Sequence, residues 1–325
     1  MREGERIRAA IVGAGLMGRW HARELQRAGG ELVGVADLDR GAAERLAREP
    51  GERSLDALLE RRPDVVHVCT PPDSHAELVE RSLGAGAHVL CEKPLAPDAA
   101  ATERLLALAA ERRLLLCPVH QYLFQSGFER TVAALPGLGP LLHADVTACS
   151  AGGEGRHSAE LDEVVAENVP HALAVLERLL PGGVGELAWD VRRPRSGELR
   201  ATATAGEATV SLLVSLAGRP TANALRLTGT GGTAHLDFFH GFATIEGDGV
   251  SRARKVTHPF ALAGATAACA AANLARRAAR GEPAYPGLRA LIALLYAAIQ
   301  TGGASPIPPE EILAVARARD VLPSR

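Results

Sequence analysis

Six residues near the N-terminus, Gly13-Ala14-Gly15-Leu16-Met17-Gly18, constrain the fold of this chain more than any other segment. The apolar run Arg8–Val12 precedes them, helical spacing follows over Arg19–Ala28, and a second apolar run, Glu31–Ala36, ends at Asp37. The pattern predicts a strand, a glycine-rich turn, a helix and a second strand. In such a unit the glycines permit a tight turn, close approach to a pyrophosphate and close helix–strand packing. The sequence therefore predicts a dinucleotide-binding domain.

Asp37 bears on the choice of cofactor. It follows Gly18 by 19 residues, where a carboxylate accepts a hydrogen bond from a ribose hydroxyl, while the helix N-terminus binds the phosphates. A carboxylate repels a 2′-phosphate, so the sequence favours NAD over NADP. Arg40, three residues later, leaves NADP open. The residues expected to bind the cofactor here are Gly13, Gly15, Leu16, Met17, Gly18 and Asp37.

The alternation of strands and helices continues to about residue 120. The apolar run Asp64–Thr70 ends at Pro71-Pro72, Ala87–Cys91 ends at Glu92-Lys93-Pro94, and Leu114–Val119 is a further strand. Ligands bind an open parallel sheet at the carboxyl ends of its strands. Further cofactor contacts are therefore expected from Thr70, Pro71, His75, Glu92 and Lys93. His75 has a second interpretation, as a brace for the helix that follows Pro71-Pro72.

Beyond Val119 the pattern changes to successive short strands. Glycine-bearing turns separate these apolar runs, which is typical of antiparallel pairing. Helical patterns return over Ala261–Arg280 and Leu288–Gln300, and a last helix follows Pro308-Pro309-Glu310. The predicted strands are Leu141–Ser150, Gly185–Arg192, Glu198–Ala205, Ala208–Leu216, Asn223–Thr228 and Thr233–Phe238. We expect two domains, residues 1–120 and 121–325.

The ordered set of the glycine loop, Asp37, Thr70-Pro71-Pro72 with His75, and Gly86–Pro94 resembles the Gfo/Idh/MocA oxidoreductases. This is the family of glucose–fructose oxidoreductase and inositol 2-dehydrogenase, and the resemblance is dense over residues 7–120. It implies an N-terminal Rossmann domain with a doubly wound parallel sheet and a C-terminal α+β domain with an open, mostly antiparallel sheet. It also implies NAD(P) and hydride transfer on a sugar, cyclitol or related polyol.

The resemblance extends to a helical segment at Ser158–Leu180. The family commonly has an Asp and a His four positions apart there, and Glu167 and His171 occupy those places. Proline disfavours the middle of a helix, so Pro170 predicts that the helix starts near it, with Glu167 just outside. From periodicity alone, His171 is a packed residue of an apolar helix. The resemblance implies catalytic roles for Lys93, His171 and Glu167, and substrate contacts from Lys93, Gln121, Glu167 and His171.

Gln121 and Leu123 bear on the choice of substrate, and Lys93 bears on proton transfer. Gln121 and Leu123 stand where family members often carry Asn and Arg, which argues against an ordinary free sugar. Lys93 and Lys255 are the two lysines among 36 basic residues. Arginine keeps its proton whereas lysine can release it, so Lys93, directly after a buried strand, is a candidate for proton transfer.

Composition excludes several other classes of function. The net charge of −2 offers no electrostatic footprint for nucleic acid or an anionic membrane. Five cysteines, an odd number without a C-x-x-C pair, favour a cytoplasmic protein with no metal site. We also expect a homodimer or homotetramer, because an antiparallel sheet with helices on one side leaves its other face to be covered. Two alternatives remain: an NAD-dependent glycosidase with no net redox change, and a non-catalytic NAD- or sugar-sensing regulator.

Overall fold

The computed structural model describes residues 6–48, 51–151, 155, 157–249 and 252–322. Packing divides the chain into two compact units: Met1–His120 with Leu288–Ala316, and Gln121–Gly287 with Arg317–Arg325. The first division follows His120, at the end of the predicted Rossmann segment. By packing, however, Leu288–Ala316 groups with the first unit. The functional assignment of residues 1–120 and 121–325 stays a prediction.

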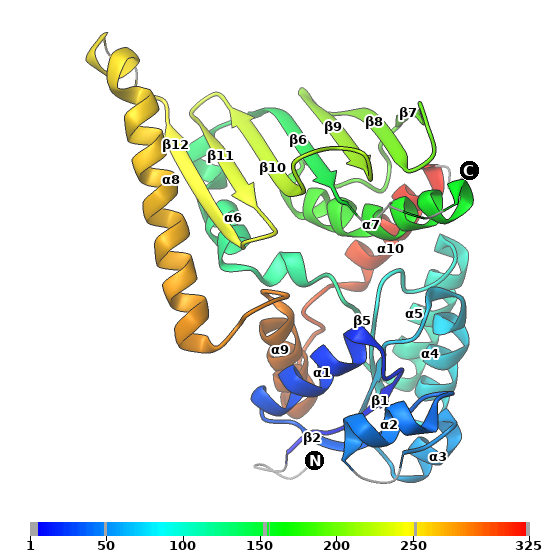
Figure 1. The fold of residues 1–325 in the computed structure, drawn as a ribbon. Helices are drawn as coiled ribbons and strands as arrows, with labels where there is room; N and C mark the ends of the chain where they lie inside the picture. The colour runs from blue at the N-terminus through cyan, green and yellow to red at the C-terminus, as the bar shows by residue number, and fades with distance from the viewer. Residues whose placement is uncertain (1–5, 49–50, 152–154, 156, 250–251, 323–325) are drawn as a thin grey trace. The chain divides into compact units, whose positions relative to one another are not determined.

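The first unit contains a five-stranded parallel sheet in the order β2-β1-β3-β4-β5 (Figure 1). Its strands are β1 (Arg8–Val12), β2 (Glu31–Ala36), β3 (Val65–Val68), β4 (His88–Cys91) and β5 (Leu116–Pro118). Its helices within residues 1–120 are α1 (Leu16–Arg27), α2 (Arg40–Ala47), α3 (Leu55–Glu60), η1 (Pro72–Ser74), α4 (His75–Gly84) and α5 (Ala99–Arg112). The strand order reverses between β1 and β3, which is where a doubly wound sheet binds its ligand.

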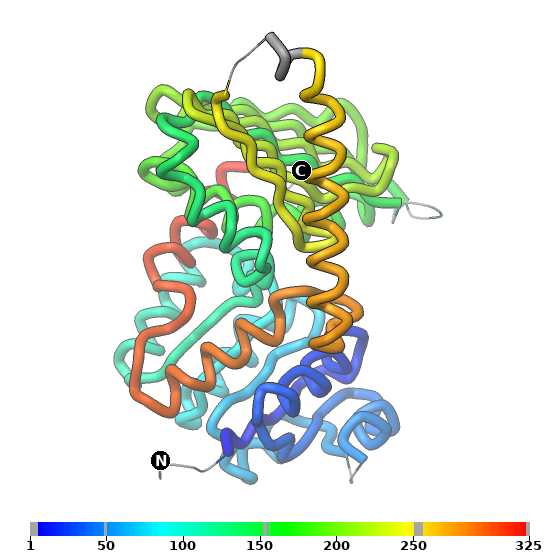
Figure 2. The backbone as a smooth tube through the Cα atoms, turned by 90° about the vertical axis from the view of Figure 1, so that its left-hand side faces the viewer, coloured from blue at the N-terminus to red at the C-terminus, as the bar shows by residue number. Residues whose placement is uncertain are grey.

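Two late helices, α9 (Leu288–Thr301) and α10 (Pro309–Val321), follow residue 287. Helix α9 packs against α1, and Figure 2 shows the two side by side. Gly30 permits this approach, because a Cβ there would lie 2.6 Å from Cε2 of Tyr296. Arg289 also donates from Nε to Glu24 Oε2 over 2.7 Å. These contacts explain why α9 groups with the first unit.

The second unit contains a seven-stranded sheet in the order β12-β11-β10-β6-β9-β8-β7. Its pairs are antiparallel except for β6 with β9, which is parallel. The sheet is therefore mixed but mostly antiparallel, as expected. Its strands are β6 (Leu141–Cys149), β7 (Asp190–Arg192), β8 (Glu198–Ala205), β9 (Ala208–Ser215), β10 (Ala222–Gly229), β11 (Gly232–Asp237) and β12 (Phe242–Gly247). Its helices are η2 (Gln121–Phe124), α6 (Ser126–Leu138), α7 (Ser158–Leu179) and α8 (Arg252–Arg280).

One face of this sheet forms the core of the second unit. A row of directly paired residues crosses six strands, and every member is at most 2% exposed. The row is Ala201, Leu212, Val146, Leu225, Leu236 and Ala243. Helix α7 packs on β8 and β9, and α6 packs on β11 and β12. The opposite face carries polar residues such as Thr202, Asp145 and Arg226, so it is the half-exposed side.

The structure corrects several expectations for the second half of the chain. Strand β12 and helix α6 were not predicted, and β7 is only Asp190–Arg192. The expectation that a helix starts near Pro170 is wrong, because α7 begins at Ser158 and passes through that proline. The apolar residues that α7 buries on both sides of Pro170, among them Val165 and Leu173, explain the longer helix.

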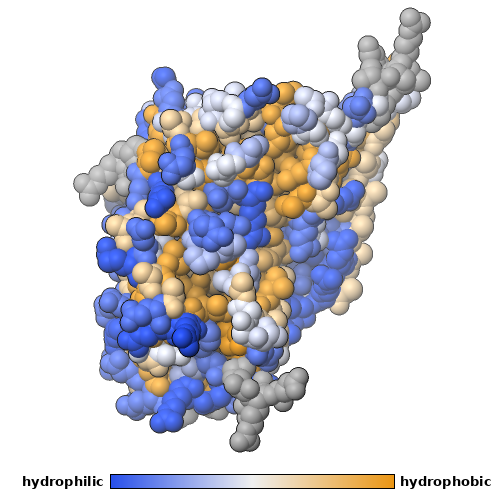
Figure 3. All heavy atoms as spheres, turned by 180° about the vertical axis from the view of Figure 1, so that it is seen from behind, coloured by the Kyte–Doolittle hydropathy of each residue, from blue (hydrophilic) through white to orange (hydrophobic). Residues whose placement is uncertain are grey.

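Helix α8 presents much of its surface to solvent. Val256, Phe260 and Leu274 are 74%, 80% and 68% exposed. Figure 3 shows weakly apolar surface along this helix at the right-hand edge of the view. Among the described helices, none is both long and apolar enough to cross a membrane.

Candidate functional site

The glycine loop between β1 and α1 has the close packing that its spacing predicts. Gly13 has φ +100°, and a Cβ there would lie 2.6 Å from the carbonyl group of Cys69. A Cβ on Gly18 would overlap the carbonyl oxygen of Gly13. Both positions are therefore closed to larger residues by the protein's own backbone.

Gly15 differs from these two glycines, because a Cβ there would meet no atom within 4 Å. It is the N-cap of α1, and no side chain caps that helix. The first amide N–H groups of a helix lack intrahelical acceptors, and the helix dipole favours an anion beside them. The loop thus has an open backbone surface with unsatisfied donors, which fits a pyrophosphate. Leu16, 61% exposed, and Met17 begin the helix at this surface.

Asp37 lies beside the same loop at the carboxyl end of β2. Its Oδ2 accepts from the Ala14 amide over 2.7 Å, and its Oδ1 accepts from the Asp39 amide over 2.8 Å. A carboxylate has about four lone-pair sites, so both oxygens can still accept from a ribose. Arg40 donates from Nε to Glu44 over 3.0 Å. The residue that left NADP open therefore already has an acidic partner.

The ends of β3 and β4 are joined by His75, whose ring is fully buried. Its Nε2 lies 2.8 Å from the carbonyl oxygen of Thr70, and its Nδ1 lies 2.7 Å from that of Pro94. Ser74 donates to the Thr70 hydroxyl over 2.7 Å. His75 therefore braces the two loops through two backbone carbonyl groups. Pro71 caps η1 directly beside it.

Glu92 and Lys93 follow β4 directly. The Glu92 side chain is buried, with Oε1 3.2 Å from Nε2 of His21. Its Oε2 accepts from the backbone N–H of Lys93 over 3.3 Å. Burial raises the pKa of the Cys69 and Cys91 thiols well above the usual value, and the nearby Glu92 raises both further. The structure thus places the Glu92 carboxylate inside the unit, near two neutral thiols, with half-buried Lys93 beside it.

In the second unit, His171 belongs to an aromatic stack. Its ring lies on that of Tyr122, with centroids 4.5 Å apart, and Tyr122 lies on Phe238 at 4.9 Å. Asn223 Nδ2 donates to the Tyr122 hydroxyl over 2.6 Å. Burial, with a smaller contribution from Tyr285, raises the pKa of Tyr122 to about 12. The stack fixes the plane of the His171 ring and keeps a neutral phenol beside it.

Glu167 lies one turn before His171 on α7 and is half-buried, so the two residues share a helix face. Gln121 belongs to η2, which packs on α7. Its side chain is 6% exposed, and its Oε1 has no hydrogen-bond partner among the described residues. A buried unpaired acceptor favours a missing donor such as a water or a substrate hydroxyl.

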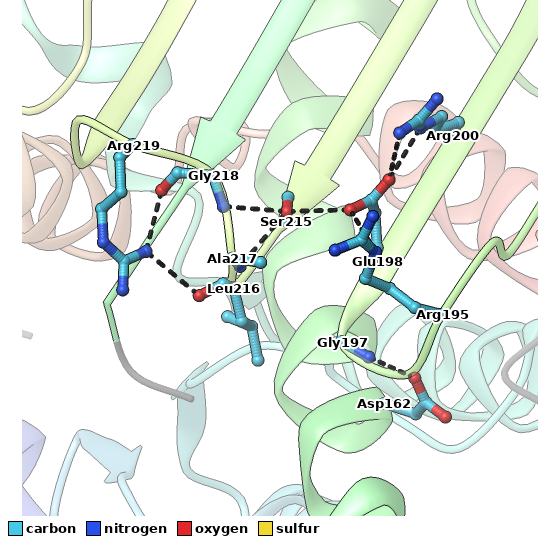
Figure 4. A network of polar contacts seen from close by, with 10 residues as sticks. All are labelled: Asp162, Arg195, Gly197, Glu198, Arg200, Ser215, Leu216, Ala217, Gly218 and Arg219. Carbon is cyan, nitrogen blue, oxygen red and sulfur yellow. Dashed lines mark hydrogen bonds and ion pairs between the residues drawn. The ribbon is translucent and has the colours of Figure 1, made fainter. Parts of the chain in front are cut away.

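Contacts shown in Figure 4 anchor the start of α7, the helix that carries Glu167. Asp162 accepts from the Gly197 amide over 2.8 Å. Glu198, 5% exposed, accepts from Arg200 Nε over 2.7 Å and from the Ser215 hydroxyl over 3.3 Å. The Gly218 amide donates to that same Ser215 hydroxyl over 3.1 Å. The β8–β9 hairpin and α7 are thereby held in one arrangement.

The predicted site residues fall into two sets. The first unit brings together the glycine loop with Asp37, and separately Thr70, His75, Glu92 and Lys93. The second unit brings together Gln121, Glu167 and His171. Their functional roles stay predictions. Sequence reasoning did not identify Tyr122 and Asn223 beside His171. It also did not identify His21, His67 and Tyr296 behind Glu92. His21, three residues after Gly18, lies near the glycine motif.

No metal-binding group of three or more His, Cys, Asp or Glu side chains occurs in the described part of the chain. The absence of a metal from the function stays a prediction.

Comparison with known proteins supports the interpretation of the first unit. Residues 7–120 match the family model GFO_IDH_MocA, described as an oxidoreductase family with an NAD-binding Rossmann fold. UDP-N-acetylglucosamine 3-dehydrogenase of Acidithiobacillus ferrooxidans is 36% identical over 133 residues, which span 38% of this chain and 42% of that protein. An inositol 2-dehydrogenase of Rhizobium meliloti is 37% identical over 114 residues, 34% of each chain. The aligned part is thus less than half of either relative.

The fold comparison covers nearly the whole chain. A solved structure of UDP-N-acetylglucosamine 3-dehydrogenase from Acidithiobacillus ferrooxidans matches with a TM-score of 0.75 at 22% identity, over 98% of this chain and 97% of that one. The predicted two-domain fold is therefore confirmed, and so is the resemblance noted from the sequence. Residues 7–120 of this chain thus match the model of the Gfo/Idh/MocA oxidoreductase family, and they have the Rossmann fold that the description of that family names.

Proposed function

We propose that this protein is an NAD-dependent oxidoreductase that transfers a hydride between nicotinamide and a CH–OH or C=O group of a sugar, cyclitol or sugar derivative. One observation carries the proposal. The open Gly15 backbone, the uncapped start of α1 and the Asp37 carboxylate belong to a domain of an NAD-binding oxidoreductase family. Leu16, Met17 and the ends of β3 and β4 are proposed to complete the cofactor contacts. NADP remains the second choice of cofactor.

The proposed reaction converts a carbinol and NAD⁺ into a carbonyl, NADH and a proton. Bound NAD supplies the hydride acceptor at the nicotinamide. The chain must hold the hydroxyl and remove its proton, which is general acid–base chemistry. Lys93 is proposed to take that proton in oxidation and return it in reduction, and His171 is proposed to assist the same proton transfer. Glu167 and Gln121 are proposed to orient the substrate.

The proposal for Lys93 and His171 derives from different observations in each unit. Lys93 follows a buried strand at the binding edge of the Rossmann sheet. The ring plane of His171 is set by Tyr122, whose raised pKa keeps the phenol neutral. The unpaired Oε1 of Gln121 favours a hydroxyl donor as its partner. A substrate rich in hydroxyl groups satisfies these requirements.

A purified-protein screen tests this function. The protein is incubated with NAD and, one at a time, myo-inositol, common sugars and nucleotide sugars such as UDP-N-acetylglucosamine, while NADH absorbance is followed. Net NADH formation with at least one compound supports the oxidoreductase. Conversion of a glycoside without net NADH supports the glycosidase alternative. Ligand-induced thermal stabilisation without turnover of any compound supports the regulator.

We further propose that the protein is a cytoplasmic homo-oligomer, a dimer or a tetramer. Free thiols at all five cysteines support a reducing compartment. The half-exposed polar face of the seven-stranded sheet and the apolar residues Val256, Phe260 and Leu274 on α8 support a second copy as the partner. Light scattering tests the assembly. A mass of 34 kDa at micromolar concentration, the monomer value, would contradict it.

A further inference from the structure

Four buried side chains of the first unit form a continuous hydrogen-bonded chain. The Tyr296 hydroxyl lies 2.9 Å from Nε2 of His67, and Nδ1 of His67 lies 2.9 Å from Nδ1 of His21. Nε2 of His21 lies 3.2 Å from Oε1 of Glu92. Tyr296 is 3% exposed, both histidines are fully buried and Glu92 is 7% exposed. The polar atoms of this chain therefore depend on one another rather than on water.

The donors of this chain can be assigned from one end. Tyr296 has a single hydroxyl proton to donate, and its hydroxyl lies within hydrogen-bond distance of His67 Nε2. If Tyr296 donates, neutral His67 carries its proton on Nδ1 and donates to His21 Nδ1. His21 then carries its proton on Nε2 and donates to Glu92. In this direction each proton has one acceptor. In the reverse direction His67 donates to the Tyr296 oxygen, and the hydroxyl proton of Tyr296 then has no acceptor within these four side chains.

The charges around the chain agree with this assignment. Burial lowers the pKa of His67 well below its usual value, so His67 is neutral. Burial raises the pKa of Tyr296 well above its usual value, so the phenol keeps its proton. The thiols of Cys69 and Cys91 near Glu92 are also neutral. Tyr296 is the buried end of the hydrogen-bonded series, and its phenol keeps its proton. The hydrogen-bonded series therefore orients the side chains and does not conduct protons.

The chain joins four elements behind the predicted proton-transfer residue. His21 is on α1, the helix that begins at the glycine loop, and His67 is on the central strand β3. Tyr296 comes from α9, and Glu92 follows β4. The second oxygen of Glu92 accepts from the backbone N–H of Lys93. Glu92 therefore links the two histidines to the backbone N–H of Lys93.

We propose that His21, His67 and Tyr296 are positioning residues that fix the Glu92 carboxylate and, through it, the catalytic geometry of Lys93. The effect on turnover rests on the proposed function, but the effect on Lys93 itself does not. The hydrogen bonds to His67 and Glu92 require one acceptor and one donor at position 21. Glutamine supplies both through its amide oxygen and nitrogen, whereas leucine supplies neither. His21→Gln and His21→Leu therefore separate the role of the hydrogen bonds from simple loss of the ring.

His88 offers a matched control on the same strand. Its Nδ1 accepts from the Leu115 amide over 2.8 Å, at the opposite end of β4 from Lys93. His88→Leu removes a histidine hydrogen bond from the same sheet without touching Glu92. Thermal unfolding of the His88→Leu and His21→Leu variants compares the loss of stability that each substitution causes.

Lys93 can be observed directly because the chain has only one other lysine, Lys255. Reductive methylation with ¹³C-formaldehyde places an NMR probe on both lysines, and Lys93→Arg assigns the signals. We expect His21→Leu to shift or split the Lys93 signal by more than its line width and leave the Lys255 signal in place. His21→Gln is expected to restore the Lys93 signal, and Tyr296→Phe to shift it less than His21→Leu does. His88→Leu is expected to leave it unchanged.

Turnover gives the second readout on unmethylated protein. We expect His21→Leu to lower kcat by about tenfold or more, since a small misplacement of a reacting group can cost this much. The KM for NAD should stay within about threefold, and His21→Gln should recover most of kcat. A structural role alone would give equal losses for the leucine and glutamine variants, or for His88→Leu. Either result would overturn the proposal.

The two proposals can fail separately. If the Lys93 signal responds as expected but no tested compound is turned over, the positioning chain stands and the proposed function fails. If NADH forms but His21→Leu changes neither the Lys93 signal nor kcat, the proposed function stands and the hydrogen bonds of His21, His67 and Tyr296 have only a structural role. If His21→Leu does not fold, Tyr296→Phe decides, because it keeps the ring and removes only the terminal donor. An unchanged Lys93 signal and kcat in Tyr296→Phe would then overturn the proposal.

Discussion

His21 Nδ1 lies 2.9 Å from His67 Nδ1, and both rings are fully buried. The first ring comes from the helix that begins at the glycine loop, and the second comes from the neighbouring strand β3. A neutral histidine has one donor and one acceptor nitrogen, so this contact requires one ring to donate and the other to accept. The contact thereby gives helix α1 and strand β3 a fixed polar connection within an apolar core.

The first prediction concerns Gly15. Valine at this position enters open space, so Gly15→Val should fold but place its side chain where a pyrophosphate approaches α1. We expect NAD affinity to fall by about tenfold or more, which corresponds to about 1.4 kcal/mol. Gly84→Val is the control, since Gly84 also has open space beside it but belongs to α4. Calorimetry that gives wild-type affinity for both variants would refute the cofactor site.

Asp37 leads to a prediction about the preference between NAD and NADP. Asp37→Ala removes the carboxylate that we propose accepts from a ribose and repels a 2′-phosphate, so the difference in affinity between NAD and NADP should narrow. Asp37→Asn keeps an acceptor for the loop amides while removing the charge, and it should narrow the difference as well. Arg40→Ala should have little effect, because Arg40 pairs with Glu44. A wild-type preference for NADP by about tenfold would show that Asp37 is misassigned.

How much of the fold the sequence predicts depends on how local each signal is. The Rossmann strands and Glu198–Ala205 have clear apolar patterns, and the structure has them at or near the predicted bounds. Helix α6 contains Pro136-Gly137, a pair that usually marks a turn, so its helical spacing was not recognised. Strand β12 is only six residues long between Gly241 and Asp248, and it depends on pairing with β11.

In the candidate site, too, only residues with a local sequence signal could be predicted. Lys93 follows a strand in a recognisable motif, so its place at the binding edge of the sheet could be predicted. Tyr296 contacts His67 across 229 residues of sequence, and no local pattern connects them. The stack of His171 on Tyr122 also joins separate elements, η2 and α7. Such contacts depend on tertiary packing, which periodicity does not report.

A prediction about pH follows from His67. Its pKa in the folded protein is lowered by burial, whereas the unfolded chain has the ordinary value of about 6.5. Below about pH 6.5 the unfolded state therefore binds a proton that the folded state does not, and stability must fall as the pH falls. Between pH 6 and 5, we expect His67 to lower the free energy of unfolding by on the order of 1 kcal/mol for each pH unit of acidification. Denaturant unfolding of wild type and His67→Leu at several pH values measures it, and equal slopes would contradict the prediction.

The aromatic stack gives a prediction for the second unit. Tyr122→Phe keeps the ring under His171 and loses only the hydrogen bond from Asn223, so kcat should fall by less than about threefold. Tyr122→Ala removes the support of the ring, and kcat should fall by about tenfold or more because His171 becomes misplaced. NAD binding, measured by calorimetry, should be unaffected in both variants. Equal kcat values for the phenylalanine and alanine variants would show that the stack does not orient His171.

The most direct test of the account is the kcat of Lys93→Arg with whichever compound yields NADH in the wild type. Arginine keeps the positive charge but does not release its proton at neutral pH. If Lys93 transfers the hydroxyl proton, kcat should fall by roughly 10²–10⁴ while calorimetry still detects NAD binding. His171→Asn should add less than its separate effect to that of Lys93→Arg, because residues that serve one proton transfer act as a unit. Lys93→Arg that keeps most of the wild-type kcat would contradict the account.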